Sequence, residues 1–171
     1  MLKKTPRGDL MLEGVKIIFR NFGGRPGKFK PAGDRGFSVL LDKDLAEALK
    51  DDGFNVKTLK PREEGDEPAF HLPVKVKYNG NRYDPTVVLV TDRGRTTLTE
   101  DMVDIVDISD ITNVDLVINA YNYEVNGSTG ISAYLQRAYI TIEEDEFERK
   151  YSNVPDSAKP TMEYLEEFMD D

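Results

Sequence analysis

Alternation of apolar and polar residues is the strongest constraint on the fold of this chain, because a two-residue period places the apolar side chains on one face of a β-strand. A clear example is the stretch in which Val74, Val76 and Tyr78 alternate with Lys75 and Lys77. Similar stretches, separated by segments rich in glycine, proline and charge, predict strands at about 14–20, 37–41, 70–78, 84–91, 112–123 and 131–142, with a brief strand at 54–58.

Two segments carry the signals of short helices. Asp42 is a good N-cap and Gly53 suits the position after a last turn, which predicts a helix over 43–51. Thr97 and Glu100 form a capping-box pattern, which predicts a second helix ending near residue 106. The residues expected to face inward from this second helix are Met102, Val103 and Val106.

The order of these elements predicts a mainly β protein. The chain has several predicted strands, then a helix near residue 100, then a final hairpin around Asn126 and Gly127. This order matches an OB-fold-like five-stranded barrel, in which the helix at 43–51 is an insertion. A sandwich of short strands is the alternative. We expect one domain over 1–151, followed by a disordered acidic tail over 152–171.

The charge is unevenly distributed along the chain. The net charge is −9, but residues 1–40 carry nine Lys or Arg against three Asp or Glu, a net charge of +6. Residues 143–171 carry three Lys or Arg against eleven Asp or Glu, a net charge of −8. A basic beginning and an acidic end predict separate roles for the two ends of the chain.

Cations and aromatic rings occur together in the basic part. Single-stranded nucleic acids are held by cations along the phosphates and by rings on which bases stack, so this combination predicts a binding segment. Its candidate residues are Arg20, Phe22, Arg25, Lys28, Phe29, Lys30 and Arg35. The alternative is an ordinary hairpin loop whose Phe22 and Phe29 fold back onto the core.

Two further sets of residues are candidates for binding. Tyr121 and Tyr123 share a strand face next to the last hairpin loop, a place where OB-folds contact bases. The tail combines apolar anchors with carboxylates, which suits docking onto a basic-rimmed pocket of a partner protein. The candidate tail residues are Tyr164, Phe168, Asp170 and Asp171.

Several classes of function lack the residues they need. The chain has no cysteine and one histidine, so thiol nucleophiles, zinc sites and Ser-His-Asp catalysis have little to build on. Asp104, Asp107 and Asp110 are better explained by turns and solvation than by a metal site. We therefore expect no enzyme activity, no metal and no cofactor. We also expect no signal peptide and no membrane span, because no sufficiently long apolar run is present.

Five segments, read in order and spacing, carry a resemblance to a known family. They are Gly14–Phe22, Gly36–Leu41, Gly53–Lys57, Val114–Ile118 and Gly130–Leu135. Over about residues 10–151 the chain resembles the single-stranded-DNA-binding proteins of tailed bacteriophages. The resemblance implies an OB-fold core that coats single-stranded DNA, and an acidic tail that recruits replication or recombination proteins in the cytoplasm of an infected bacterium. A non-enzymatic protein-interaction module, such as a virion component or an inhibitor of a host protein, is the alternative function.

Overall fold

A computed structural model describes residues 2–4, 9–28, 31–61 and 63–143 of the chain. The predicted domain boundary at 151 and the predicted tail lie outside these residues. The described residues form ten strands, one α-helix and one 3₁₀ helix, so the predicted mainly β class with one or two short helices is confirmed. The strands are β1 Leu2–Lys4, β2 Leu10–Val15, β3 Ile17–Asn21, β4 Arg35–Leu41, β5 Lys57–Leu59, β6 Ala69–Val76, β7 Thr86–Thr91, β8 Gly94–Leu98, β9 Ile111–Val125 and β10 Ser128–Ile142; the helices are α1 Lys43–Asp52 and η1 Val103–Ile108.

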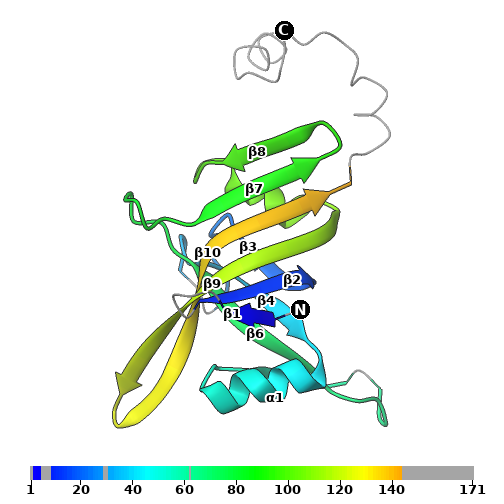
Figure 1. Cartoon of the computed structure of the whole chain (residues 1–171), viewed down its shortest axis with the longest axis vertical. Coiled ribbons are helices and arrows are strands. Elements are labelled where there is room, and N and C mark those ends of the chain that lie inside the picture. The colour runs from blue at the N-terminus through cyan, green and yellow to red at the C-terminus, as the bar shows by residue number, and fades with distance from the viewer. Residues whose placement is uncertain (1, 5–8, 29–30, 62, 144–171) are drawn as a thin grey trace, which may run out of the picture.

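All the strands belong to one sheet, which is larger and more open than the five predicted strands. The main hydrogen-bonded order is β1-β2-β9-β10-β6-β4-β3, and β5 pairs with β6 while β7 pairs with β10 and β8. The sheet wraps around one apolar core, whose largest fully buried side chains include Phe22, Leu10, Leu12, Leu49 and Leu72. In Figure 1, α1 lies at one end of the molecule and the β7–β8 hairpin at the other.

The last strand, β10, joins the two halves of this sheet. It pairs along its length with antiparallel β9, and the β9–β10 hairpin extends beyond the other strands (Figure 1). On its other edge β10 runs parallel to β6 at Ala133 and Tyr134, and then parallel to β7 from Arg137 onward. A register shift between Leu135 and Arg137 separates these two pairings, as a β-bulge does.

The helix prediction is confirmed for α1. The Asp42 carboxylate accepts a hydrogen bond of 2.7 Å from the backbone N–H of Leu45. Gly53 ends the helix in the left-handed region at φ 106°, where a residue without a Cβ is unstrained.

The second helix prediction is wrong in its start and type. Thr97 is not an N-cap but lies in β8, where it pairs with Val88 of β7. β-Branched threonines suit a strand beside β7, and this pairing outweighs the local capping pattern. The helix that follows, η1, is a 3₁₀ helix with no side-chain cap. Val103 and Val106 face inward as expected, but Met102 is 51% exposed.

The predicted first strand at 14–20 is broken into β2 and β3. Gly14 has φ 63° and the pairing of β2 with β9 shifts register between Leu12 and Val15. A second shift in the pairing of β3 with β4 lies between Ile18 and Asn21, and there Phe19 has φ 53°. Simple alternation therefore does not predict which way side chains point in this part of the chain.

Candidate nucleic-acid interface

The surface of β6 away from the core carries the candidate site. Leu72, Val74 and Val76 are buried in the core. Because side chains alternate along a strand, His71 and Lys75 lie on the opposite face, which we call the outer face. Lys75 pairs with Tyr134 of β10, so the outer face continues onto the β9–β10 hairpin.

Two adjoining hollows on the outer face form what we call the tyrosine groove. Their volumes are about 430 and 410 Å³, and both are lined by Lys75 and Tyr134. The first hollow extends along the hairpin and is also lined by Asn55, Leu72, Pro73, Tyr121, Tyr123, Val125, Ile131, Ser132 and Ala133. The second extends toward β4 and is also lined by Gly33, Asp34, Arg35, Val76, Lys77, Tyr78 and Glu100.

Rings and cations lie together within the tyrosine groove. The rings of Tyr121 and Tyr134 meet edge to face with their centroids 6.1 Å apart. The Lys75 Nζ lies 5.7 Å from the centroid of the Tyr134 ring, and the Arg35 guanidinium carbon lies 5.3 Å from that of Tyr78. Tyr121 remains 62% exposed. The groove therefore offers rings for stacking beside cations that can hold phosphates.

Tyr123 is positioned by a glycine on the neighbouring strand. Tyr123 pairs with Gly130 across the hairpin. A Cβ at Gly130 would collide with the Tyr123 ring, so this ring packs directly over the glycine backbone. Glycine at this position leaves room for the Tyr123 ring, which lies on the same strand face as Tyr121.

Arg35 is held in a fixed position at the other end of the groove. Its side chain is 17% exposed; its Nη1 donates a 2.6 Å hydrogen bond to the Phe22 carbonyl, and its Nη2 lies 3.7 Å from the Glu100 carboxylate. Burial raises the pKa of the neighbouring Tyr78 above its ordinary value, so its hydroxyl stays neutral. This end of the groove therefore presents an oriented cation beside an uncharged ring.

The structure corrects one predicted stacking residue. Phe22 is fully buried, and its ring stacks on Phe37 with a centroid distance of 5.1 Å and an interplanar angle of 9°. The ring of Phe22 is therefore part of the core, and the expectation that it stacks on bases is wrong. The stacking role was predicted because Phe22 stands among basic residues in the sequence. Local charge, however, does not show which side of a loop faces the core.

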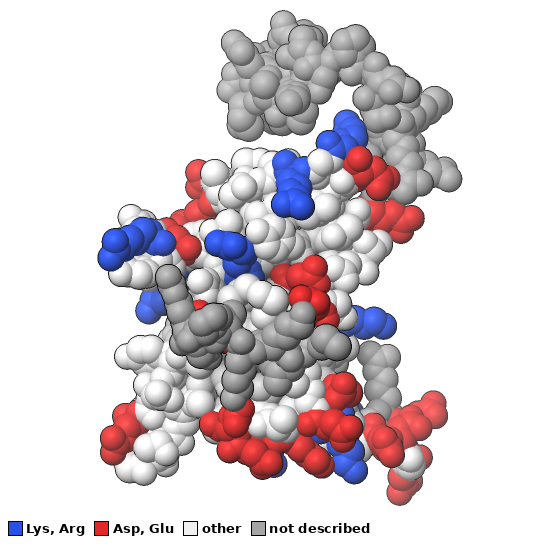
Figure 2. All heavy atoms as spheres, viewed as in Figure 1, with Lys and Arg blue, Asp and Glu red and all other residues white. Residues whose placement is uncertain are grey.

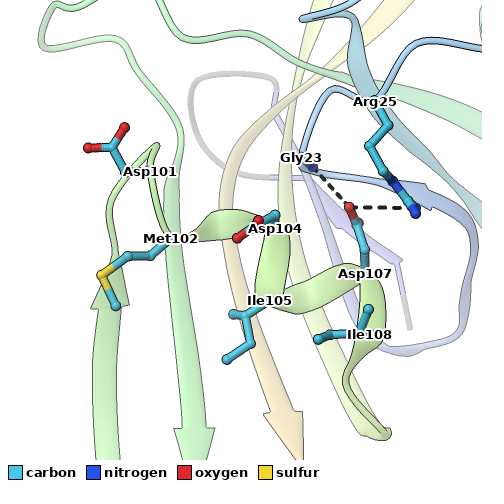
Figure 3. A pocket seen from close by; sticks show the side chains of 8 residues that line it. All are labelled: Gly23, Arg25, Asp101, Met102, Asp104, Ile105, Asp107 and Ile108. Atoms are coloured by element: carbon cyan, nitrogen blue, oxygen red, sulfur yellow. Dashed lines mark hydrogen bonds and ion pairs between the residues drawn. The ribbon is translucent and has the colours of Figure 1, made fainter. Parts of the chain in front are cut away.

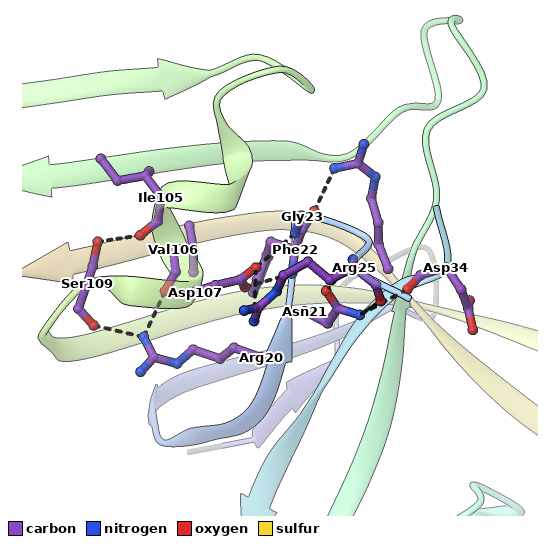
Figure 4. Close-up of polar contacts among 11 residues, drawn as sticks. Arg20, Asn21, Phe22, Gly23, Arg25, Asp34, Ile105, Val106, Asp107 and Ser109 are labelled. Atoms are coloured by element: carbon purple, nitrogen blue, oxygen red, sulfur yellow. Dashed lines mark hydrogen bonds and ion pairs between the residues drawn. The ribbon is translucent and has the colours of Figure 1, made fainter. Parts of the chain in front are cut away.

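The early cations Arg20 and Arg25 contact η1, not the tyrosine groove (Figure 4). Arg20 Nη1 donates hydrogen bonds of 2.7 and 2.8 Å to the carbonyls of Val106 and Ser109. Arg25 Nη2 lies 3.9 Å from the Asp107 carboxylate, but its side chain is 69% exposed. Arg20 thus fastens β3 to η1, and its role in DNA binding stays a prediction.

The remaining predicted residues fall into three groups. Tyr121, Tyr123 and Arg35 line the tyrosine groove. Lys28 is exposed in the loop that also contributes Gly33 and Asp34 to the groove. Phe29 and Lys30, with the tail residues Tyr164, Phe168, Asp170 and Asp171, lie outside the described residues.

Sequence reasoning missed three central residues of the groove. The sequence shows Lys75 and Tyr78 in an alternating strand and Tyr134 in a strand with other tyrosines. The alternation around Lys75 was the signal that could have placed this lysine on the outer face. The side on which Tyr134 lies depends on the bulge between Leu135 and Arg137, which the alternation does not reveal.

A separate hollow of about 500 Å³ lies beside η1 (Figure 3). Met102, Ile105 and Ile108 recur every three residues, which is one turn of a 3₁₀ helix, and all three are exposed. The surrounding side chains are Arg25 and three carboxylates, Asp101, Asp104 and Asp107. An acidic rim of this kind is unsuited to phosphate, so the tyrosine groove is the better candidate for nucleic acid.

Metal and membrane sites find little support in the described part of the chain. Within it, no group of three or more His, Cys, Asp or Glu side chains is placed to hold a metal ion. Neither of its two helices has the length and apolar composition of a membrane span.

Figure 2 shows carboxylates gathered over α1 at the foot of the molecule.

Comparison with known proteins identifies the family. The fold is similar to that of the single-stranded DNA-binding protein from bacteriophage Enc34, with 15% identity, 92% of this chain and 97% of that chain covered, and a TM-score of 0.51. It is similar to the same phage protein in complex with ssDNA, with 15% identity, coverage of 83% and 90%, and a TM-score of 0.52. No curated protein matches the sequence. The family model described as a putative phage ssDNA-binding domain matches residues 1–170, so the chain belongs to the phage ssDNA-binding domain family, as the resemblance predicted.

Proposed function

We propose that this protein binds single-stranded DNA along the tyrosine groove, without strong preference for base sequence and without catalysing a reaction. The observation that carries the proposal is the pairing of rings with cations on one continuous surface, Tyr134 with Lys75 and Tyr78 with Arg35. Stacking tolerates every base, and cations contact the phosphates that all sequences share. Membership in the phage family supports single-stranded DNA as the ligand.

The biological setting follows from the same family. We propose that the protein coats single strands during phage DNA replication or recombination inside an infected bacterium, with no cofactor. We further propose that residues 1–151 form the binding domain and that residues 152–171 recruit replication or recombination proteins, through Tyr164, Phe168, Asp170 and Asp171. Arg25, Lys28, Phe29 and Lys30 remain candidates for additional phosphate and base contacts at the edge of the groove.

Substitutions within the groove test the proposal by separating stacking from charge. Tyr134→Ala should weaken binding to an oligo-dT strand by about 1–3 kcal/mol, the contribution of one stacked base, while leaving the salt dependence almost unchanged. Lys75→Gln should instead flatten the slope of log affinity against log salt by about 0.7, the value for one phosphate contact on a single strand. Fluorescence anisotropy titrations at several salt concentrations measure both quantities.

Lys50→Gln is a matched control for Lys75→Gln. Lys50 is an exposed lysine in the last turn of α1 that lines neither hollow of the groove, and its loss should leave the salt slope unchanged. If Tyr134→Ala and Lys75→Gln both bind as the unmodified protein does, DNA does not use this groove.

A protein-interaction module is the second candidate function, favoured by the exposed apolar side chains of η1. Ile108 is 81% exposed and Met102 is 51% exposed, in a hollow with an acidic rim. If the intact protein shows no affinity for single-stranded DNA at low salt, where phosphate contacts are strongest, this second function replaces the first.

A further inference from the structure

Phe19 is an aromatic residue whose conformation and exposure are both unusual. Its φ of 53° lies in the left-handed region, which is strained for a bulky side chain, and its side chain is 61% exposed. Burial in the core therefore does not offset this strain. Strained residues of this kind persist where the surrounding structure holds them, and they are concentrated at functional sites.

The ring of Phe19 lies on the outer face, the same face as the tyrosine groove. Its centroid is 5.5 Å from that of His71, and the two rings meet edge to face. His71 lies two alternations along β6 from Lys75, so both side chains lie on the outer face. The register shift at Phe19 thus turns a phenylalanine toward the surface that carries the tyrosines.

A cation accompanies this ring, as in the groove. Lys57 of β5 pairs directly with His71, so the two side chains share a face, and the charge of Lys57 acts on His71. The first hollow of the groove is lined by Asn55, two residues before Lys57, and by Pro73, two residues after His71 in β6. The groove therefore runs toward the position of Phe19.

We propose that Phe19 is a second base-stacking position on the same DNA path, and that Lys57 is its phosphate contact. This inference rests on the proposed function. His71 and Lys75 are four positions apart in β6, which is about 13 Å at 3.3 Å per residue. At 3.4 Å or more per nucleotide, no more than about four nucleotides separate a base on Phe19 from a base on Tyr134.

A tryptophan probe tests this stacking directly. The chain contains no tryptophan, so Phe19→Trp introduces a single indole whose emission can be excited selectively. Titration with a dT16 oligonucleotide should quench this emission, because a base stacks on the ring. The matched control is Ile108→Trp, which places an indole at an exposed position on η1 within the acidic hollow. Its emission should remain unchanged.

Affinity measurements test the contribution of the ring. Phe19→Asn removes the ring but tolerates a positive φ, and should weaken dT16 binding by about 5- to 150-fold with no change in the salt slope. Phe19→Tyr keeps a ring, and should bind within about twofold of the unmodified protein. Lys57→Gln should flatten the salt slope by about 0.7.

The outcomes distinguish this inference from the proposed function. If Tyr134→Ala weakens binding but Phe19→Trp is not quenched and Phe19→Asn binds normally, the second position is refuted and the tyrosine groove stands. If Phe19→Trp is quenched and Phe19→Asn loses affinity while Tyr134→Ala binds normally, the DNA path includes Phe19 but not the groove as proposed. If none of these variants differs from the unmodified protein, both proposals are wrong.

Discussion

Removing the Asp107 carboxylate should destabilise the protein more than removing any other acidic side chain of η1. Its Oδ1 accepts a 2.7 Å hydrogen bond from the Phe22 backbone N–H, and its Oδ2 accepts one of 2.9 Å from the Gly23 N–H. The side chain is only 2% exposed. Asp107→Ala therefore leaves two partly buried N–H groups without their acceptor.

The expected cost follows from these two bonds. A hydrogen bond to a charged group contributes about 1.5–3 kcal/mol, so losing both should cost about 3–6 kcal/mol. Proteins of this size lose about 2–4 °C of melting temperature per kcal/mol, so the melting temperature should fall by at least about 6 °C. Asp107→Asn keeps one acceptor oxygen but offers an NH₂ group to the second N–H, so it should lose about half as much.

Two controls isolate the contribution of the hydrogen bonds. Asp104→Ala removes an exposed carboxylate one turn earlier in η1 and should change stability by about 0.5 kcal/mol or less. Arg25→Ala removes only the exposed ion pair with Asp107, which should contribute no more than about 1 kcal/mol. Thermal unfolding followed by circular dichroism compares all the variants. If Asp107→Ala melts as Asp104→Ala does, the carboxylate does not hold the Phe22–Gly23 turn.

Three further predictions follow from contacts described above. Phe22→Ala should lower the free energy of unfolding by about 3–5 kcal/mol because it empties a fully buried site. The folded variant should keep the salt dependence of DNA binding. A normal melting temperature would contradict the placement of Phe22 in the core. Gly130→Ala should displace the Tyr123 ring and weaken oligo-dT binding with little loss of thermal stability, and unchanged affinity would exclude Tyr123 from the site. Burial, with the charge of Lys57, lowers the pKa of His71 below 6.5. The contribution of this group to stability is therefore complete above pH 6.5 and declines as the pH falls below it. Between pH 7.5 and 5.5 the melting temperature of His71→Leu should fall less than that of the unmodified protein.

The fold was predictable where local signals and tertiary pairing agree. Asp42 and Gly53 mark the ends of α1 as predicted, because an N-cap and a left-handed glycine at the C-terminus act through contacts within the helix itself. Thr97 failed as a cap because its place is set by pairing with Val88, a contact that lies outside any local window. Phe19 shows the limit of alternation, since one register shift reverses the face on which a ring lies.

The site was predictable in kind but only partly in position. Rings combined with cations were expected, and Tyr121, Tyr123 and Arg35 do line the groove. Phe22 was misassigned because core and surface rings have the same appearance in a glycine-rich loop. Lys75 and Tyr134 meet only because β6 and β10 run side by side in parallel, and this pairing joins segments about 60 residues apart, which local pattern does not specify.

The position of β10 in the sheet has a consequence for synthesis. Ribosomes release the N-terminal part of a chain first, yet β10 is the strand that pairs with β6, β7 and β9. Until residues 128–142 emerge, β7 lacks its partner along one edge and β6 lacks its partner at Val74 and Lys75, and such unpaired edges favour aggregation. Lys75 also lacks its neighbour Tyr134 during that interval. The tyrosine groove therefore forms only after residues 128–142 have been translated, so shorter nascent chains lack the proposed DNA-binding surface.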